Sequence, residues 1–85
     1  MTFVDAYETL NNPKNVKFAE LLKIATQFFG VPRVSGTSHH VFKVPWQGEP
    51  WVNLQTDGKM AKPYQVKQVI RALKKLEEMK NEKAE

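Results

Sequence analysis

His39 and His40 stand side by side and are the 2 histidines of the chain. Imidazole has an unperturbed pKa of about 6.5, so near neutral pH it can both accept and release a proton. Cleavage of RNA by its own 2′-hydroxyl needs one group to take that proton and another to protonate the leaving 5′-oxygen. Ser38 can donate a hydrogen bond to a phosphate, and Lys43 can hold the phosphate or stabilise its charge. The segment 38–43 is therefore the candidate site for acid–base chemistry on a phosphodiester. The alternative is that the exposed histidine is an ordinary surface residue of a strand, which is the commoner case.

Other catalytic chemistries fit the chain less well. Its 85 residues include no cysteine, which excludes thiolate catalysis, zinc–thiolate sites and disulfide bonds. Adjacent histidines on a strand diverge, and no Asp or Glu lies close to them in the sequence, so we expect no metal site. A Ser-His-Asp hydrolase would need a Gly-x-Ser-x-Gly turn between a strand and a helix, and the sequence lacks that motif. We expect a protein that uses no metal and no cofactor.

The strand expected to carry the histidines gives the two rings different surroundings. Residues 39–44 alternate, and alternating side chains point to opposite faces of a sheet. One face holds His40, Phe42 and Val44, and the other holds His39, Val41 and Lys43. The first face is the more apolar, so we expect His40 to lean toward the core and His39 to face solvent.

A run of basic residues late in the chain is the second candidate feature. The formal net charge of +4 favours polyanionic partners, and no acid interrupts residues 59–75. The cations of this run are Lys59, Lys62, Lys67, Arg71, Lys74 and Lys75. Those from residue 67 onward follow helical spacing, so they form one stripe that can contact phosphates. The alternative to phosphate binding is that these cations form an ordinary solvent-exposed helix face, whose positive charge is offset by the acidic residues after residue 76.

The elements that position these residues follow from the hydrophobic pattern. A helix is predicted from about Val16 to Phe29, and a last helix from about Pro63 to Lys80. Between them we expect three short strands, at 31–35, 39–44 and 51–56, joined as an antiparallel meander because no crossover helix separates them. The predicted class is α+β: helix, three-stranded antiparallel sheet, helix, with both helices on one face of the sheet.

Local signals set the expected boundaries of these elements. Asn15 can cap the first helix and Gly30 can end it. Pro32 favours an edge position for the first strand. Residues 1–15 read as an N-terminal extension, in which the helical spacing of apolar residues allows a short packing helix. Residues 81–85 read as a frayed tail, which leaves residues 16–80 as the single domain.

Trp46 and Trp51 flank the loop at 47–50. Exposed rings there could stack on unpaired bases, but we expect the two tryptophans to pack on the core or to anchor the loop. In a third interpretation they, or the N-terminal extension, are the apolar anchor of a protein-interaction domain.

Nothing in the sequence resembles a targeting or membrane segment. Residues 1–10 contain two acids and no apolar run, and no stretch approaches the roughly 18 apolar residues of a membrane helix. We expect a cytoplasmic protein with no membrane partner.

Three segments together resemble the HicA family of toxin mRNA interferases, over about residues 17–73. They are Phe18-Ala19-Glu20-Leu21-Leu22-Lys23, Arg33-Val34-Ser35-Gly36-Thr37-Ser38-His39-His40-Val41-Phe42-Lys43, and Lys62-Pro63 opening Val66-Lys67-Gln68-Val69-Ile70-Arg71. The most specific part is the Ser-His-His-x-Phe sequence between a first helix and a second strand. This chain departs from the usual Gly-Ser start, since Thr37 stands before Ser38.

The resemblance implies a fold like that of double-stranded-RNA-binding domains and a metal-independent endoribonuclease that cleaves mRNA. It also implies inhibition by a partner antitoxin of the HicB type. Carried over to this chain, His39 is the first candidate for the catalytic histidine and His40 the second. The rival hypothesis is a non-catalytic double-stranded-RNA-binding module of the same fold.

Overall fold

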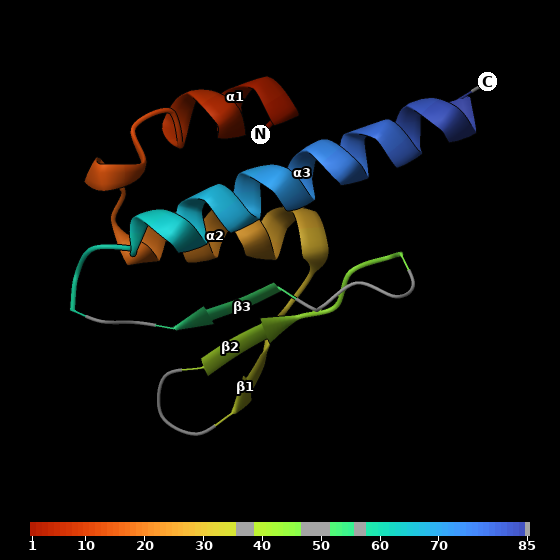
Figure 1. Ribbon diagram of the computed structural model, residues 1–85. Coiled ribbons are helices and arrows are strands. Elements are labelled where there is room, and N and C mark those ends of the chain that lie inside the picture. Colours follow the sequence, from red (N-terminus) through yellow and green to blue (C-terminus); the bar gives the residue numbers. More distant parts are fainter. Residues whose placement is uncertain (36–38, 47–51, 56–57, 85) are drawn as a thin grey trace.

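The computed structural model describes residues 1–35, 39–46, 52–55 and 58–84 (Figure 1). Its elements in chain order are α1 (Phe3–Thr9), the short 3₁₀ helix η1 (Pro13–Asn15), α2 (Phe18–Phe29), β1 (Arg33–Ser35), β2 (His39–Phe42), β3 (Val52–Gln55) and α3 (Pro63–Ala84). This arrangement confirms the predicted α+β class.

The three strands form one antiparallel sheet in the order β1-β2-β3. The meander is therefore as predicted, and β1 lies at an edge, where Pro32 cannot interrupt a central ladder. The register of β2 against β3 pairs His40 with Leu54 and Phe42 with Val52. Since Leu54 and Phe42 are both fully buried, this side of the sheet faces the core.

Helices α2 and α3 cover that side of the sheet, as predicted (Figure 1). Helix α2 buries Phe18, Leu21, Ile24 and Ala25. The spacing of apolar residues along 16–29 predicts a buried stripe of Phe18, Leu21, Leu22, Ala25 and Phe29. Ile24 is buried although it is not in this stripe, and Leu22 and Phe29 are only half-buried. Helix α3 contributes buried side chains at regular helical spacing: Val66, Val69, Ala72, Leu73 and Leu76.

Helix α2 begins at Phe18, two residues later than predicted, and Asn15 does not cap it. Lys17 holds the N-cap position without a side-chain hydrogen bond. The residues just before the helix pair instead with a distant segment: Val16 accepts a hydrogen bond from the Ala61 N–H at 2.8 Å, and Lys17 forms a β-bridge with Met60. This extended pairing holds residues 16 and 17 out of the helix. The other end is as predicted, because Gly30 has a φ of 91° and its N–H donates to Thr26.

The N-terminal segment forms a helix that packs on the side of α3 away from the sheet (Figure 1). A capping box starts α1, in which Thr2 and Asp5 exchange two hydrogen bonds of 3.1 Å. The bond from the Thr2 backbone is the main reason that the pKa of the Asp5 carboxyl lies below its ordinary value. Ala6 and Leu10 are fully buried, so the segment contributes to the same core as α2 and α3.

Two aromatic residues of α1, Phe3 and Tyr7, contact the neighbouring helices α2 and α3. The Phe3 ring lies 4.8 Å from the Phe28 ring of α2, centroid to centroid. The Tyr7 hydroxyl donates a 3.0 Å hydrogen bond to a carboxylate oxygen of Glu77 on α3. Helix α3 itself continues past Lys80, where an end was expected, to Ala84.

Candidate nucleic-acid interface

The two histidines at the start of β2 face opposite sides of the sheet, as the alternation predicts. His40 is paired with Leu54, on the side that faces the helices, and His39 is paired with Gln55, on the other side. The His40 ring lies 5.6 Å from the ring of Phe18, at the start of α2, with 58° between the two planes. The position of His40 on β2 thus places its ring on the helix-facing side of the sheet, next to the start of α2.

The two histidines do not differ in their degree of solvent exposure. His39 and His40 are both half-buried, so the expectation that His39 alone faces water is only partly met. On the outer side of the sheet His39 is paired with Ser35 of β1 and Gln55 of β3, while Arg33 lies opposite Val41 and thus diagonal to His39. The two rings therefore differ in their neighbours rather than in their exposure.

The elements β2, α2 and α3 begin at the same end of the molecule (Figure 1), and several basic residues lie in the segments that lead into the two helices. The bridge between Lys17 and Met60 joins the start of α2 to the segment before α3, and the Phe18 N–H donates to the Lys59 carbonyl oxygen at 2.9 Å. Lys17 and Lys59 are exposed, and Lys62 directly precedes α3. We call this group of three lysines, Lys17, Lys59 and Lys62, the basic end.

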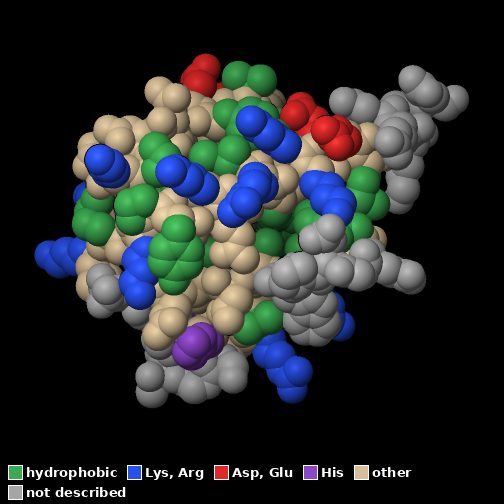
Figure 2. All heavy atoms as spheres, in the orientation of Figure 1, with side chains coloured by type: hydrophobic (Ala, Val, Ile, Leu, Met, Phe, Trp, Pro, Cys, Tyr) green, Lys and Arg blue, Asp and Glu red, His purple; other side chains and the backbone are tan. Residues whose placement is uncertain are grey.

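Further cations continue along α3 from the basic end. Lys67, Arg71 and Lys74 are exposed on this helix. Figure 2 shows Lys and Arg side chains spread over the face that α3 forms, with a histidine near the lower edge of the same face. The helix and the segment before it thus carry several exposed cations on one face of the molecule.

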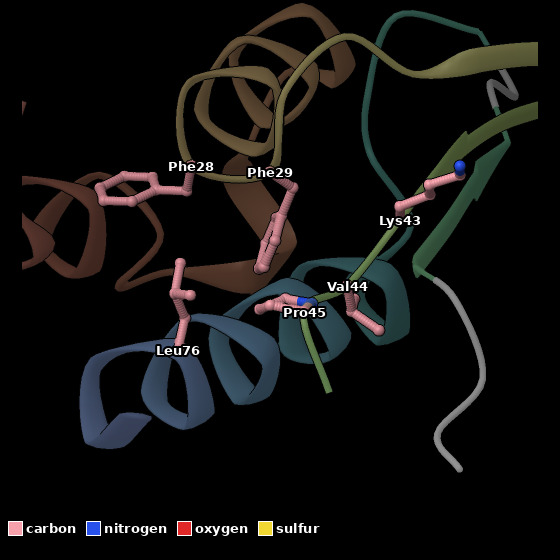
Figure 3. A pocket seen from close by; sticks show the side chains of 6 residues that line it. All are labelled: Phe28, Phe29, Lys43, Val44, Pro45 and Leu76. Atoms are coloured by element: carbon pink, nitrogen blue, oxygen red, sulfur yellow. The ribbon is translucent and has the colours of Figure 1, made fainter. Parts of the chain in front are cut away.

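Lys43 and Lys75 lie away from the histidines, among apolar residues at the opposite end of the sheet. Lys43 is four positions past His39, or about 13 Å along an extended chain. It lines a pocket of about 330 Å³ together with Phe28, Phe29, Val44, Pro45 and Leu76 (Figure 3). In this view its ammonium group points away from Leu76. The Lys75 ammonium lies 5.0 Å from the centre of the Trp46 ring. The predicted RNA-binding residues are therefore divided between two regions.

Trp46 packs against the core, as expected, rather than standing out as a stacking platform. It is half-buried, and its ring meets the ring of Phe29 edge-on at 6.3 Å. Its indole Nε1 is buried and has no hydrogen-bond partner among the described residues. Ser38, Trp51 and the turn at 36–37 fall outside the described residues, so the structure does not bear on the roles predicted for them.

Two residues of this region were not singled out in the sequence. Lys17 joins the basic end only through its pairing with Met60, a contact between distant segments that no local pattern signals. Tyr64 is 59% exposed on the first turn of α3, and the Lys62 ammonium lies 6.0 Å from the centre of its ring. Its position outside the apolar stripe of α3 was a signal that could have identified it as a surface aromatic.

None of the described helices combines the length and apolarity needed to cross a membrane. Within the same residues, no three side chains of His, Cys, Asp or Glu lie together in a way that could hold a metal ion.

Comparison with known proteins adds no relative from which a function could be transferred. No protein-family model, no curated protein and no solved structure matches this chain.

Proposed function

We propose that this protein is a metal-independent endoribonuclease, the activity that the resemblance to HicA toxins implies. The observation that best supports the proposal is the ring contact between His40 and Phe18. It brings an imidazole to the side of the sheet where α2 begins, and thus toward the basic end. A proton-transfer group beside several cations is the minimum that transesterification of RNA requires.

The surroundings of the two rings favour His40 over His39 for the proton transfer. His40 lies on the same side of the sheet as Phe18, whose backbone is bonded to that of Lys59. His39, favoured by the alternation alone, lies on the opposite side of the sheet and has Arg33 as a basic strand neighbour. In this proposal a phosphodiester held by the basic end meets the ring of His40 rather than that of His39.

In the proposed reaction the imidazole takes the proton of a ribose 2′-hydroxyl as that oxygen attacks the adjacent phosphorus. The bond from phosphorus to the 5′-oxygen breaks, and this oxygen leaves as a hydroxyl with a proton from a lysine ammonium group or from water. Lys17 and Lys59 stabilise the negative charge that grows on the phosphoryl oxygens. The products are a 2′,3′-cyclic phosphate and a 5′-hydroxyl end.

RNA would reach this site along the positive surface of α3. Each ammonium or guanidinium group that contacts a phosphate releases bound counterions, so binding should weaken steeply with salt. The resemblance also supports a HicB-like antitoxin as the partner that inhibits the enzyme. The same positive surface would equally serve a non-catalytic RNA-binding module, which remains the alternative.

Incubation of the purified protein with a labelled RNA in EDTA tests the proposal. We expect cleavage fragments that end in a 2′,3′-cyclic phosphate, and no cleavage of a matched strand with 2′-deoxyribose at the cut position. If the protein binds RNA in a salt-sensitive way but does not cleave it, the proposed endoribonuclease activity is wrong and the non-catalytic RNA-binding module is the remaining hypothesis.

A further inference from the structure

Two lysines of the basic end, Lys17 and Lys59, also line a groove on the surface, and the apolar part of this groove has no role in the reaction described above. The groove lies between the first turns of α2 and the segment at 58–59, and its volume is about 380 Å³. The residues that line it are Lys17, Phe18, Ala19, Leu22, Gly58 and Lys59. Its volume falls within the range of about 300–1,000 Å³ that is usual for small-ligand sites.

The walls of this groove are held together by the backbone. The Phe18 N–H donates to the Lys59 carbonyl oxygen at 2.9 Å, and the bridge between Lys17 and Met60 lies directly beside that bond. Because both walls are tied at this point, the groove exists before a ligand arrives. A preformed site loses less entropy on binding than one that must be ordered.

The chemistry of the groove combines an apolar surface with cations at its edge. Phe18, Ala19 and Leu22 present carbon atoms, and the exposed residues Lys17 and Lys59 line the groove beside them. A ligand that fits must therefore have an apolar, compact body and at least one negative charge close to it. A nucleobase joined to its phosphate has this combination.

The groove adjoins the proposed reaction site through one residue, Phe18. Phe18 lines the groove, is 8% exposed, and has its ring 5.6 Å from the ring of His40. A base in the groove would thus be separated from the imidazole by a single aromatic side chain. The phosphate attached to such a base would lie near the proton-transfer group.

We propose that this groove holds one unpaired base of the RNA, next to the phosphodiester that is cleaved. The inference rests on the proposed function and makes it more specific, because a base can enter the groove only if it is not paired. The substrate is therefore single-stranded RNA or an RNA loop, since base-paired RNA offers only its backbone and shallow groove to a protein.

A substitution that fills the groove tests this proposal on RNA. Ala19 is exposed, so Ala19→Trp adds bulk inside the groove without removing a core side chain. We expect it to lower the affinity for a single-stranded oligonucleotide by about 5- to 150-fold, the equivalent of losing one stacked base at about 1–3 kcal/mol. The matched control is Gln27→Trp, on an exposed position of α2 two turns away, which should bind like the wild type. Equal binding by Ala19→Trp and the wild type would overturn the proposal.

A titration with adenosine 5′-monophosphate tests the groove independently of cleavage. We expect the backbone amide NMR signals of Ala19, Leu22 and Gly58 to shift saturably, and the shifts to be lost in Ala19→Trp. Ribose 5-phosphate serves as the probe without a base. If it produces the same shifts as the nucleotide, the groove is a phosphate site only and the proposal is wrong.

The two experiments also distinguish a failure of the groove from a failure of the enzyme. One outcome is that the nucleotide shifts the NMR signals of the groove, that Ala19→Trp abolishes these shifts, and that the protein cleaves no RNA. This result would support the base site and contradict the proposed ribonuclease activity. Cleavage that proceeds equally in the wild type and in Ala19→Trp, with no nucleotide shifts at the groove, would support the ribonuclease and overturn the base site.

Discussion

Single residues of β2 show how strongly strand alternation determines the site. Phe42 is fully buried and Val41, its neighbour, is half-buried on the opposite side of the sheet. The same alternation turns His40 toward Phe18 and His39 away from it. The identity of the candidate catalytic ring therefore depends on the register of one four-residue strand.

The facing of β2 can be tested by a pair of alanine substitutions. Phe42→Ala should lower the free energy of unfolding by about 3–5 kcal/mol, because it leaves a cavity in the core. Val41→Ala removes a side chain from the outer face and should cost much less. Urea unfolding measures both. A larger loss in Val41→Ala than in Phe42→Ala would mean that the strand faces the other way and that the two histidines exchange surroundings.

Tyr7 gives the fold a pH dependence in the alkaline range. Burial, together with the hydrogen bond to Glu77, raises the pKa of Tyr7 from 10.0 to about 12. Because the folded pKa lies above the unfolded one, this contribution to stability is complete below pH 10. It is lost as the pH rises toward 12.

We therefore expect the difference in stability between the wild type and Tyr7→Phe to shrink as the pH rises from about 10 to about 12. Below that range the hydrogen bond should favour the wild type by about 1 kcal/mol. Urea unfolding of both proteins across the pH series measures the difference, and groups common to both cancel. A difference that stays constant throughout would show that Tyr7 does not titrate as described.

At the scale of the elements, the start of α2 and the segment before α3 form the basic end only by pairing with each other. Their hydrogen bonds join residues more than 40 positions apart, between Phe18 and Lys59 and between Val16 and Ala61. Sequence patterns predicted the helices, the meander and the facing of β2 because these depend on local periodicity. They missed Lys17 and the late start of α2 because both depend on this long-range pairing.

The division of the predicted RNA-binding residues yields a test of its own. Lys59 belongs to the basic end, whereas Lys43 lies among apolar residues at the opposite end of β2. We expect Lys59→Met to weaken binding to RNA and to reduce the log–log salt slope by about one, the value for one lost phosphate contact. The control, Lys43→Met, should leave the slope unchanged. Fluorescence anisotropy across a salt series measures both, and equal slopes for the two variants would contradict a phosphate site at the basic end.

At the scale of the whole molecule, the N-terminal helix is part of the core that supports the site. Ala6 and Leu10 are fully buried, and α1 contacts α2 through Phe28 and α3 through Glu77. The sequence allowed a packing helix here, because its apolar residues have helical spacing. Their local pattern could not tell which surface they cover, since the partners come from two distant helices.

Substitutions in α1 should therefore destabilise the entire fold. Leu10→Ala should lower the free energy of unfolding by about 2–5 kcal/mol in a single cooperative transition. Val4→Ala is the control, because Val4 lies on the same helix and is 59% exposed. Circular dichroism during urea unfolding measures both. Equal stability of the two variants would show that α1 does not contribute to the core.

The most direct test of proton transfer by His40 compares RNA cleavage by His40→Gln and by His39→Gln. Both variants are assayed in EDTA and checked for unchanged thermal stability. Glutamine keeps a polar side chain of similar length but cannot transfer the proton. We predict that His40→Gln abolishes cleavage while RNA binding persists, and that His39→Gln still cleaves RNA. Full activity in His40→Gln, with activity lost in His39→Gln, would contradict the assignment and move the reaction to the outer face of the sheet.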